Sequence, residues 1–212
     1  GYAESKLNRP VNKSVLLKEA HSSPGSIDGL LRKGILSILL QETGRLEDSE
    51  LPAEPLKELT EEQEKALNQV SGTFREKDIA LLHGVTSSGK TEIYIHLIEE
   101  QLKLGKQVLY LLPEIALTTQ IIQRLQKHFS SVTGIYHSRF SNPERVEIWN
   151  RVAGLDPTKD YRLIIGARSA LFLPFHNLGI VIVDEEHDGS YKQHDPSPRY
   201  HARDSAIVLA GL

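Results

Sequence analysis

Apolar residues along positions 61–212 follow two alternating patterns, short unbroken runs and helical spacings. The unbroken runs predict strands, and apolar residues three and four positions apart predict helices. Strands are expected at 79–82, 108–112, 133–137, 162–165 and 179–183. Helices are expected at 61–70, 90–104 and 115–129, from Asn142 onward and from about Arg203 onward. Because unbroken apolar strands that alternate with helices form a parallel sheet covered on both faces, the fold class is α/β.

Two local signals refine this alternation. Asn142 is expected to cap a helix whose first position is Pro143, since asparagine accepts from free backbone N–H groups and proline needs none. Residues 51–60 are acidic and carry two prolines, which predicts a linker. The α/β lobe is therefore expected to occupy residues 61–212.

Residues 1–50 carry a different pattern. Helical segments are expected at 14–20 and 26–34, separated by a break at Pro24 and Gly25, and an apolar run follows at 35–40. Helix, turn, helix and strand in this order predict part of a winged-helix DNA-binding module. A helical hairpin without a DNA role is the alternative.

The composition of the chain limits the kinds of partner and cofactor that it can be expected to bind. The chain has 212 residues and a formal net charge of −3, so nucleic-acid binding must rest on local sites rather than on bulk charge. Cysteine is absent, which excludes disulfides and cysteine-ligated zinc within this chain and fits a reducing compartment. No apolar run reaches the roughly 18 residues of a membrane-spanning helix, so no membrane partner is expected. The first residue is not methionine, and the chain is interpreted as a piece of a longer protein.

A G-x-x-x-x-G-K-[ST] segment lies between the first expected strand and the helix that begins at Lys90. Glycines in such a loop let successive N–H groups turn inward and hold phosphates at a helix N-terminus. Lys90 is expected to reach the β- and γ-phosphates, and the Thr91 hydroxyl to ligate Mg²⁺. The nucleotide-binding residues are predicted to be Gly84, Val85, Thr86, Ser87, Ser88, Gly89, Lys90 and Thr91.

An acidic group follows the last expected strand. Asp184 directly follows the apolar run 180–183, where an enzyme with a phosphate loop needs a carboxylate for Mg²⁺. Glu185 is the natural general base to orient and deprotonate an attacking water. Lys90 and Glu185 are therefore the predicted catalytic residues. A solvated acidic turn is the alternative for this segment alone.

These two motifs together resemble the superfamily 2 helicases and translocases, and further segments resemble the PriA family of primosomal replication-restart helicases (primosomal protein N′). The resemblance is strong over residues 60–212 and weak over 1–50, where that family carries a winged-helix domain. The segments that carry it are 84–91, 112–120, 134–138, 166–172, 184–193 and 198–204.

The resemblance implies a RecA-like ATP-binding lobe of an ATP-dependent 3′-to-5′ DNA helicase that restarts stalled or repaired forks and assembles the primosome. It implies ATP and Mg²⁺ as cofactors. It also implies branched and single-stranded DNA, primosome proteins and single-strand-binding proteins as partners, in the bacterial cytoplasm at replication forks. Glu186 and His187 would couple nucleotide state to a second lobe. Residues that would contact the single strand are Thr118, Thr119, Arg168 and Ser169.

Two departures from the family pattern are visible. Ser88 stands where the family often has glycine, and it is expected to be tolerated if its backbone stays in the ordinary torsion region. The family's 3′-end-binding domain, second lobe, arginine finger and zinc-binding cysteines are not in this sequence. The fragment is therefore expected to bind nucleotide, to hydrolyse it poorly and to hold no zinc.

Several interpretations stay open. The function is either a helicase lobe or a nucleotide-gated switch that binds forks without unwinding, and a small-molecule kinase is a weaker third. Gln63 is a candidate to read adenine, as in the glutamine motifs upstream of helicase phosphate loops. Arg168 is either a DNA contact or a solvated cation. Tyr191 and Tyr200 either stack on bases or pack the loop after the acidic group.

Overall fold

The structure is a computed structural model that describes residues 25–26, 29–30, 33–34, 54–85, 88–114, 116–117 and 119–211. The chain divides into two units, Gly1–Gly44 and Arg45–Leu212. The predicted winged-helix module at 1–50 and the start of the predicted linker, 51–53, lie almost entirely outside the described residues. That module and its boundary therefore remain predictions.

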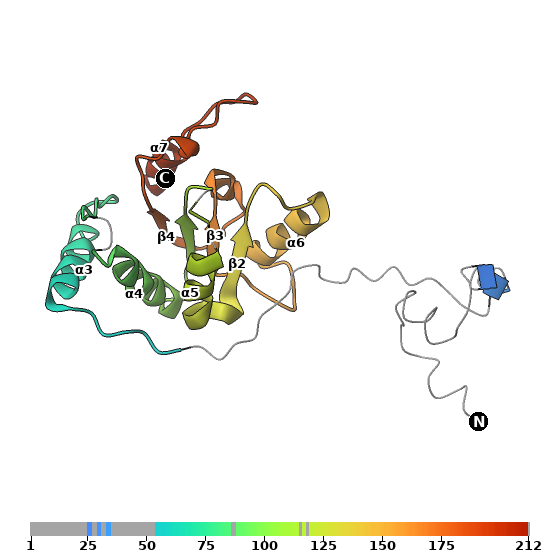
Figure 1. Cartoon of the computed structure of the whole chain (residues 1–212), viewed down its shortest axis with the longest axis horizontal. Helices are drawn as coiled ribbons and strands as arrows, with labels where there is room; N and C mark the ends of the chain where they lie inside the picture. The colour runs from blue at the N-terminus through green and yellow to red at the C-terminus, as the bar shows by residue number, and fades with distance from the viewer. Residues whose placement is uncertain are drawn as a thin grey trace. The chain divides into compact units, whose positions relative to one another are not determined.

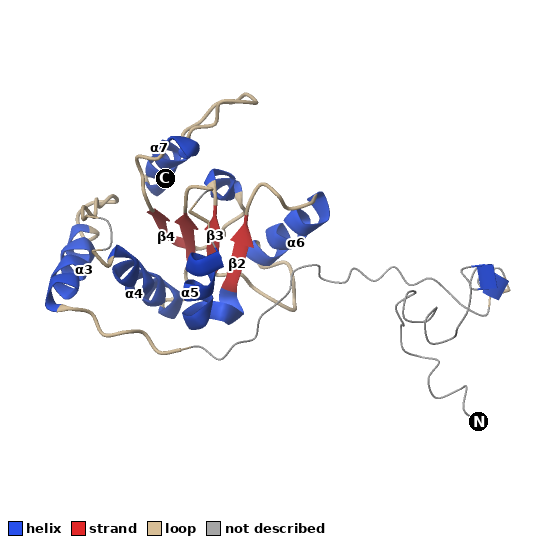
Figure 2. Cartoon of the chain, in the orientation of Figure 1, coloured by secondary structure: helices blue, strands red, loops and turns tan. Residues whose placement is uncertain are grey.

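The second unit contains one parallel sheet of four strands (Figure 2). The order across the sheet is β2-β3-β1-β4, and every neighbouring pair is parallel. The strands are β1 Gln107–Leu111, β2 Thr133–Tyr136, β3 Leu163–Gly166 and β4 Leu178–Val183. Parallel pairing places all four carboxyl ends at one edge, where ligands of open α/β sheets usually bind.

Helices connect the strands and cover the sheet (Figure 1). The α-helices are α3 Glu61–Thr73, α4 Lys90–Lys103, α5 Thr119–Phe129, α6 Asn142–Val152 and α7 Ala202–Ala210. The short 3-10 helices are η1 Ser130–Val132, η2 Arg168–Phe172 and η3 Gly189–Tyr191. Within the described part of the second unit, four strands and five α-helices match the predicted order, with boundaries that differ by a few residues.

The two faces of β1 explain why helices cover both sides. Val108 and Tyr110 belong to the core cluster that includes side chains of α4 and α5. Leu109 and Leu111 belong to the cluster that includes side chains of α6 and α7. Successive side chains of a strand point to opposite faces, so an unbroken apolar run needs a cover on each face. The predicted α/β fold with helices on both faces is confirmed.

The predicted strand at 79–82 is wrong. This segment is extended but is not part of the sheet. Ala80 and Leu82 pack against the cluster formed by Val70 and residues of α4, whereas Leu81 is 75% exposed. A strand also needs a backbone partner, and none of the four described strands pairs with this segment.

Two predicted helix starts also differ. α5 begins at Thr119, four residues after the predicted start. α6 is capped by Ser141 instead of Asn142, because the Ser141 side chain and Glu144 form a reciprocal capping box. Pro143 then occupies the second helical position, where its missing N–H costs no hydrogen bond.

Candidate nucleotide-binding site

The loop from Gly84 to Thr91 ends in a turn that leads into α4. Gly89 is the residue before the helix and has φ of +80°, a torsion that glycine adopts without strain. Ser88 follows Ser87, a residue outside the described ones, so the expectation that a serine is tolerated there stays a prediction. Thr86 and Ser87 lie outside the described residues, and their predicted role stays a prediction.

Lys90 folds back over this loop. Its ammonium group donates to the Gly84 carbonyl at 2.8 Å. A Cβ atom on Gly84 would lie 2.8 Å from the Ser88 hydroxyl oxygen, so a side chain at position 84 would require this hydroxyl to move. The described ends of the loop therefore lie beside the lysine side chain at the N-terminus of a helix, a position that favours anions.

Gln63 supports the loop from α3. Its side-chain oxygen accepts from the Thr60 N–H at 2.9 Å, as part of a capping box at the start of that helix. Its side-chain nitrogen donates to the Gly89 carbonyl at 3.3 Å. Both ends of the amide are engaged within the protein, and the adenine-reading role predicted for Gln63 stays a prediction.

Asp184 lies at the carboxyl end of β4, beside β1. Its N–H donates to the Leu111 carbonyl at 3.0 Å, which extends the parallel ladder by one residue. The Tyr110 hydroxyl donates to Oδ2 at 2.9 Å, and the Glu185 N–H donates to Oδ1 at 3.1 Å. Burial, with the neighbouring Asp184 carboxylate, raises the pKa of Tyr110 well above its ordinary value, so this hydroxyl keeps its proton and remains a donor.

Glu185 has an unusual backbone. Its φ of +48° lies in the left-handed region, which is uncommon for residues other than glycine. Its side chain remains 46% exposed, beside the open part of the site. Backbone strain of this kind is concentrated at functional positions, which fits the predicted role of Glu185 in orienting water.

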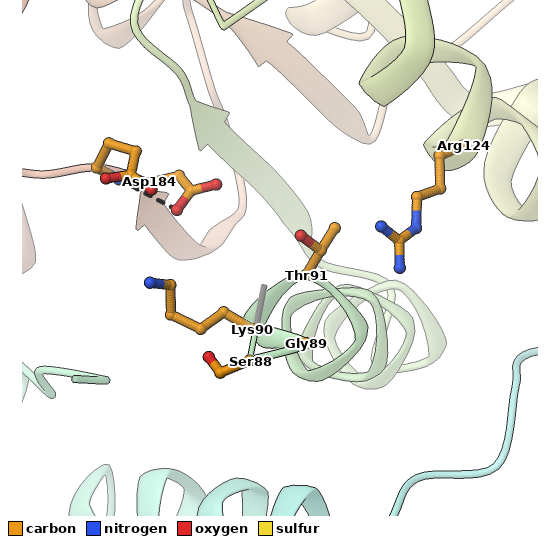
Figure 3. A pocket seen from close by; sticks show the side chains of 7 residues that line it. Ser88, Gly89, Lys90, Thr91, Arg124 and Asp184 are labelled. Carbon is orange, nitrogen blue, oxygen red and sulfur yellow. Dashed lines mark hydrogen bonds between the residues drawn. The ribbon is translucent and has the colours of Figure 1, made fainter. Parts of the chain in front are cut away.

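The loop and the acidic group line one cavity of about 380 Å³ (Figure 3). The Lys90 side chain extends toward Asp184, and Thr91 lies between Lys90 and Arg124 in this view. A cavity of this size suits a small ligand. Its lining residues are Ser88, Gly89, Lys90, Thr91, Arg124, Asp184 and Glu185.

Arg124 was not predicted from the sequence. It belongs to α5 and forms an ion pair with Glu92 of α4, the residue after Thr91. Glu92 and Arg124 are 32 positions apart, and no spacing rule connects them. Only the packing of α4 beside α5 places this cation at the cavity.

The donors of the cavity suit one type of metal. Thr91 supplies a hydroxyl and Asp184 a carboxylate, and both line the same cavity. Within the described residues, no group of three or more His, Cys, Asp or Glu side chains could hold a metal by itself. Mg²⁺ commonly binds through one or two carboxylates together with substrate phosphates, so these donors fit Mg²⁺ that arrives with a nucleotide.

The two predicted coupling residues differ in their surroundings. Glu186 accepts from Arg203 of α7 at 2.7 Å, which ties the acidic group to that helix. His187 is 75% exposed, and its Nε2 lies 3.8 Å from a carboxylate oxygen of Glu185. A salt bridge at a largely exposed position contributes little stability, and the coupling roles of Glu186 and His187 remain predictions.

The predicted DNA contacts follow the carboxyl ends of β1 and β3. Thr119 is exposed at the start of α5, whereas Ser169 is half-buried in η2. Arg168 donates to the Ser190 carbonyl at 2.9 Å and hydrogen-bonds Tyr200, so it is not a freely solvated cation. Thr118 lies outside the described residues. A role of these residues in DNA binding remains a prediction.

The two tyrosines after the acidic group have separate environments. Tyr191 is fully buried, and its hydroxyl donates to the carbonyls of Asp184 at 2.6 Å and Leu111 at 3.0 Å. Packing is therefore the correct interpretation for Tyr191. Tyr200 is half-buried and meets the exposed Phe172 edge-on, with ring centroids 4.8 Å apart. Burial raises the pKa of Tyr200.

None of the helices in the described part of the chain is long and apolar enough to cross a membrane. Curated relatives named "Replication restart protein PriA" match most of the chain. The protein of Chlamydia muridarum is 40% identical over 210 residues, which cover 96% of this chain and 27% of that relative. The protein of Bacillus subtilis is 43% identical over 200 residues, covering 92% and 24% respectively.

The protein of Haemophilus influenzae is 53% identical over 133 residues, which cover 63% of this chain and 18% of that relative. The chain thus spans about a quarter of the length of the first two relatives, and the predicted resemblance to the PriA family is confirmed. Residues 54–206 match the family described as "DEAD/DEAH box helicase". This match agrees with the parallel sheet, its helices and the phosphate loop, which together form a RecA-like lobe. The chain belongs to the DEAD/DEAH box helicase family.

Proposed function

We propose that this chain is the ATP-binding lobe of an ATP-dependent DNA helicase that moves 3′ to 5′, restarts replication at stalled or repaired forks and assembles the primosome. The observation that carries the proposal is the single cavity lined by Lys90, Thr91 and Asp184. The matched relatives are named for replication restart, which supports the cellular role.

The roles of the cavity residues follow from their chemistry. Backbone N–H groups of 84–91 and the Lys90 ammonium hold the phosphates, and Thr91 with Asp184 holds Mg²⁺. Bound Mg²⁺ supplies charge neutralisation for the phosphates. Glu185 orients a water and accepts its proton. The exposed carboxylate of Glu185 borders the cavity, which supports this role.

The remaining predicted residues connect this chemistry to DNA. Thr118, Thr119, Arg168 and Ser169 contact the backbone of the single strand. Glu186 and His187 transmit nucleotide state to a second lobe, and residues 1–50 contribute a winged-helix reader of branched DNA. The partners are forked and single-stranded DNA, primosome proteins and single-strand-binding proteins in the bacterial cytoplasm.

The isolated lobe should bind nucleotide but turn it over slowly. Phosphoryl transfer in a cleft between two lobes needs residues from both lobes. An arginine finger from the second lobe contributes roughly 10³- to 10⁵-fold in rate. Arg124 is the arginine at this cavity, and its ion pair with Glu92 keeps it on the wall of its own lobe. DNA-stimulated turnover by this chain at the rate of a complete helicase would contradict this expectation.

The test uses the longer protein of which this lobe would form part. Lys90→Ala removes the phosphate ligand, and Lys103→Ala removes a cation at the other end of α4 as the matched control. Fork unwinding and fork binding are measured separately. Loss of unwinding and of restart with Lys90→Ala alone supports the helicase. Restart that continues without unwinding would favour the nucleotide-gated switch instead.

A further inference from the structure

The carboxylate of Asp184 is held by a buried hydroxyl from the neighbouring strand. Tyr110 of β1 is fully buried and pairs in register with Ile182 of β4. Asp184 lies two residues beyond Ile182 and therefore on the same face of the sheet. The tyrosine side chain reaches along this face, and its hydroxyl donates to Asp184 Oδ2 at 2.9 Å.

The backbone of Asp184 is fixed from the opposite face. Tyr110 belongs to the core cluster beneath α4 and α5, and Tyr191 belongs to the cluster beneath α6 and α7. The Tyr191 hydroxyl donates to the Asp184 carbonyl at 2.6 Å. Two buried hydroxyls therefore act on one residue, with Tyr110 on the side chain and Tyr191 on the main chain.

The Tyr110 ring has little freedom to move. It packs edge-on against Tyr94 of α4, with ring centroids 5.8 Å apart. A phenylalanine would fill the same volume in this apolar cluster, so the hydroxyl adds a directed hydrogen bond and not packing. A fixed donor at one carboxylate oxygen selects one orientation of the side chain.

We infer that Tyr110 is a positioning residue for Mg²⁺, which orients the Asp184 carboxylate toward the cavity that Thr91 and Lys90 share. This inference rests on the proposed nucleotide site. Hydrogen bonds that orient a metal-binding group commonly change metal affinity by about 10- to 100-fold. Tyr110 does not touch the metal or the nucleotide and acts through Asp184 alone.

The experiment measures metal affinity directly in this chain. Mn²⁺ replaces Mg²⁺ as a paramagnetic probe and is titrated into the chain saturated with ADP, with free Mn²⁺ followed by electron paramagnetic resonance. Tyr110→Phe is expected to weaken Mn²⁺ binding about tenfold. Binding of ADP without metal, measured by calorimetry, should change less than twofold because the phosphate loop is untouched.

Tyr94→Phe is the matched control. Tyr94 is also buried and contacts the same cluster, but in the described part of the chain its hydroxyl makes no hydrogen bond to Asp184. This variant should keep the Mn²⁺ affinity of the unmodified chain. Equal Mn²⁺ affinity in Tyr110→Phe and the unmodified chain, or an equal loss in both variants, would overturn the inference.

A double-mutant cycle separates positioning from general loss of structure. In Asp184→Asn the side chain no longer offers a carboxylate, so adding Tyr110→Phe should weaken Mn²⁺ binding less than twofold further. A full tenfold additional loss would show that Tyr110 acts through some other group. If the unmodified chain binds neither ADP nor Mn²⁺ with ADP, the proposed nucleotide site itself fails. If it binds both and Tyr110→Phe behaves the same, only the role of Tyr110 fails.

Discussion

The two sides of the cavity are held in place by different means. On the acidic side, Asp184 receives hydrogen bonds from two buried tyrosines and lies at the end of a strand. On the phosphate side, the side-chain contacts of the loop are Lys90 to Gly84 and Gln63 to Gly89, both from half-buried residues. Backbone hydrogen bonds from Ser88 to Val85 and from Glu92 to Gly89 accompany them. The acidic side is therefore held by buried side chains of the core, whereas the phosphate side is held by half-buried ones.

This contrast predicts separate consequences for changes on the two sides. Changes on the phosphate side should reduce nucleotide affinity with a small effect on stability. Changes on the acidic side should reduce the free energy of unfolding even without a ligand.

Lys90→Ala should weaken ATP binding about 100-fold, since charge-assisted hydrogen bonds to an anion contribute about 1.5–3 kcal/mol. The free energy of unfolding should fall by no more than about 1 kcal/mol, because the bond to Gly84 is a single contact. Calorimetric titration and chemical denaturation measure the two quantities. Lys103→Ala, at the last position of α4, should change neither. A large loss of stability in Lys90→Ala would contradict the contrast.

Tyr191→Phe should lower the free energy of unfolding by about 1–3 kcal/mol, the range for a buried carbonyl that loses its donor. The Tyr191 hydroxyl donates a hydrogen bond to the carbonyls of Leu111 and Asp184, and Tyr191→Phe removes both bonds. Chemical denaturation without nucleotide provides the measurement. Tyr94→Phe serves as the control and should cost less than about 0.5 kcal/mol. An equal loss of unfolding free energy in the two variants would show that the Tyr191 hydroxyl does not stabilise the acidic side.

Gln63→Glu should weaken ATP binding about fivefold, which corresponds to one net hydrogen bond of about 1 kcal/mol. A glutamate can still accept from the Thr60 N–H and preserve the capping box, but it cannot donate to the Gly89 carbonyl. Gln69→Glu makes the same charge change at an exposed position of α3. If both variants bind ATP equally well, the contact to Gly89 has no role in the loop.

His137, which does not line this cavity, should make the free energy of unfolding depend slightly on pH. Burial, followed by the charge of Arg139, lowers the pKa of His137 below its ordinary value near 6.5. The unfolded chain therefore takes up a proton first as the pH falls, and the folded state loses stability below about pH 6.5 until the lowered pKa is passed. Denaturation curves of His137→Gln should show a flatter pH profile than the unmodified chain. Identical profiles would exclude this contribution.

The sequence contains local signals for the fold and the site. The order of helices and strands was predicted correctly, whereas the roles of the site residues stay predictions. The phosphate loop, the apolar strand before Asp184 and the alternation of helices and strands depend on neighbouring residues. The apolar run 79–82 was misread because its pattern fits a strand, while sheet membership depends on a partner elsewhere in the chain. Ser141 replaced Asn142 as the cap because the choice depends on whether Glu144 reaches back.

The contacts that sequence analysis missed all connect distant positions. Tyr110 meets Asp184 across 74 positions, and Arg124 meets Glu92 across 32. The tyrosine lies within an apolar strand and appears in the sequence as an ordinary core residue. Only the register of β1 beside β4 places its hydroxyl at the carboxylate. Residues that orient a site from the core therefore leave no local pattern.

The most direct test of the central claim is the effect of Mg²⁺ on nucleotide binding. A non-hydrolysable ATP analogue is titrated into the unmodified chain and into Asp184→Asn, each with and without Mg²⁺. Mg²⁺ should tighten binding to the unmodified chain at least tenfold and should change binding to Asp184→Asn less than twofold, in line with the cost of losing a metal-binding group. Equal tightening in both chains, or no binding to either, would contradict a nucleotide site built from Lys90, Thr91 and Asp184.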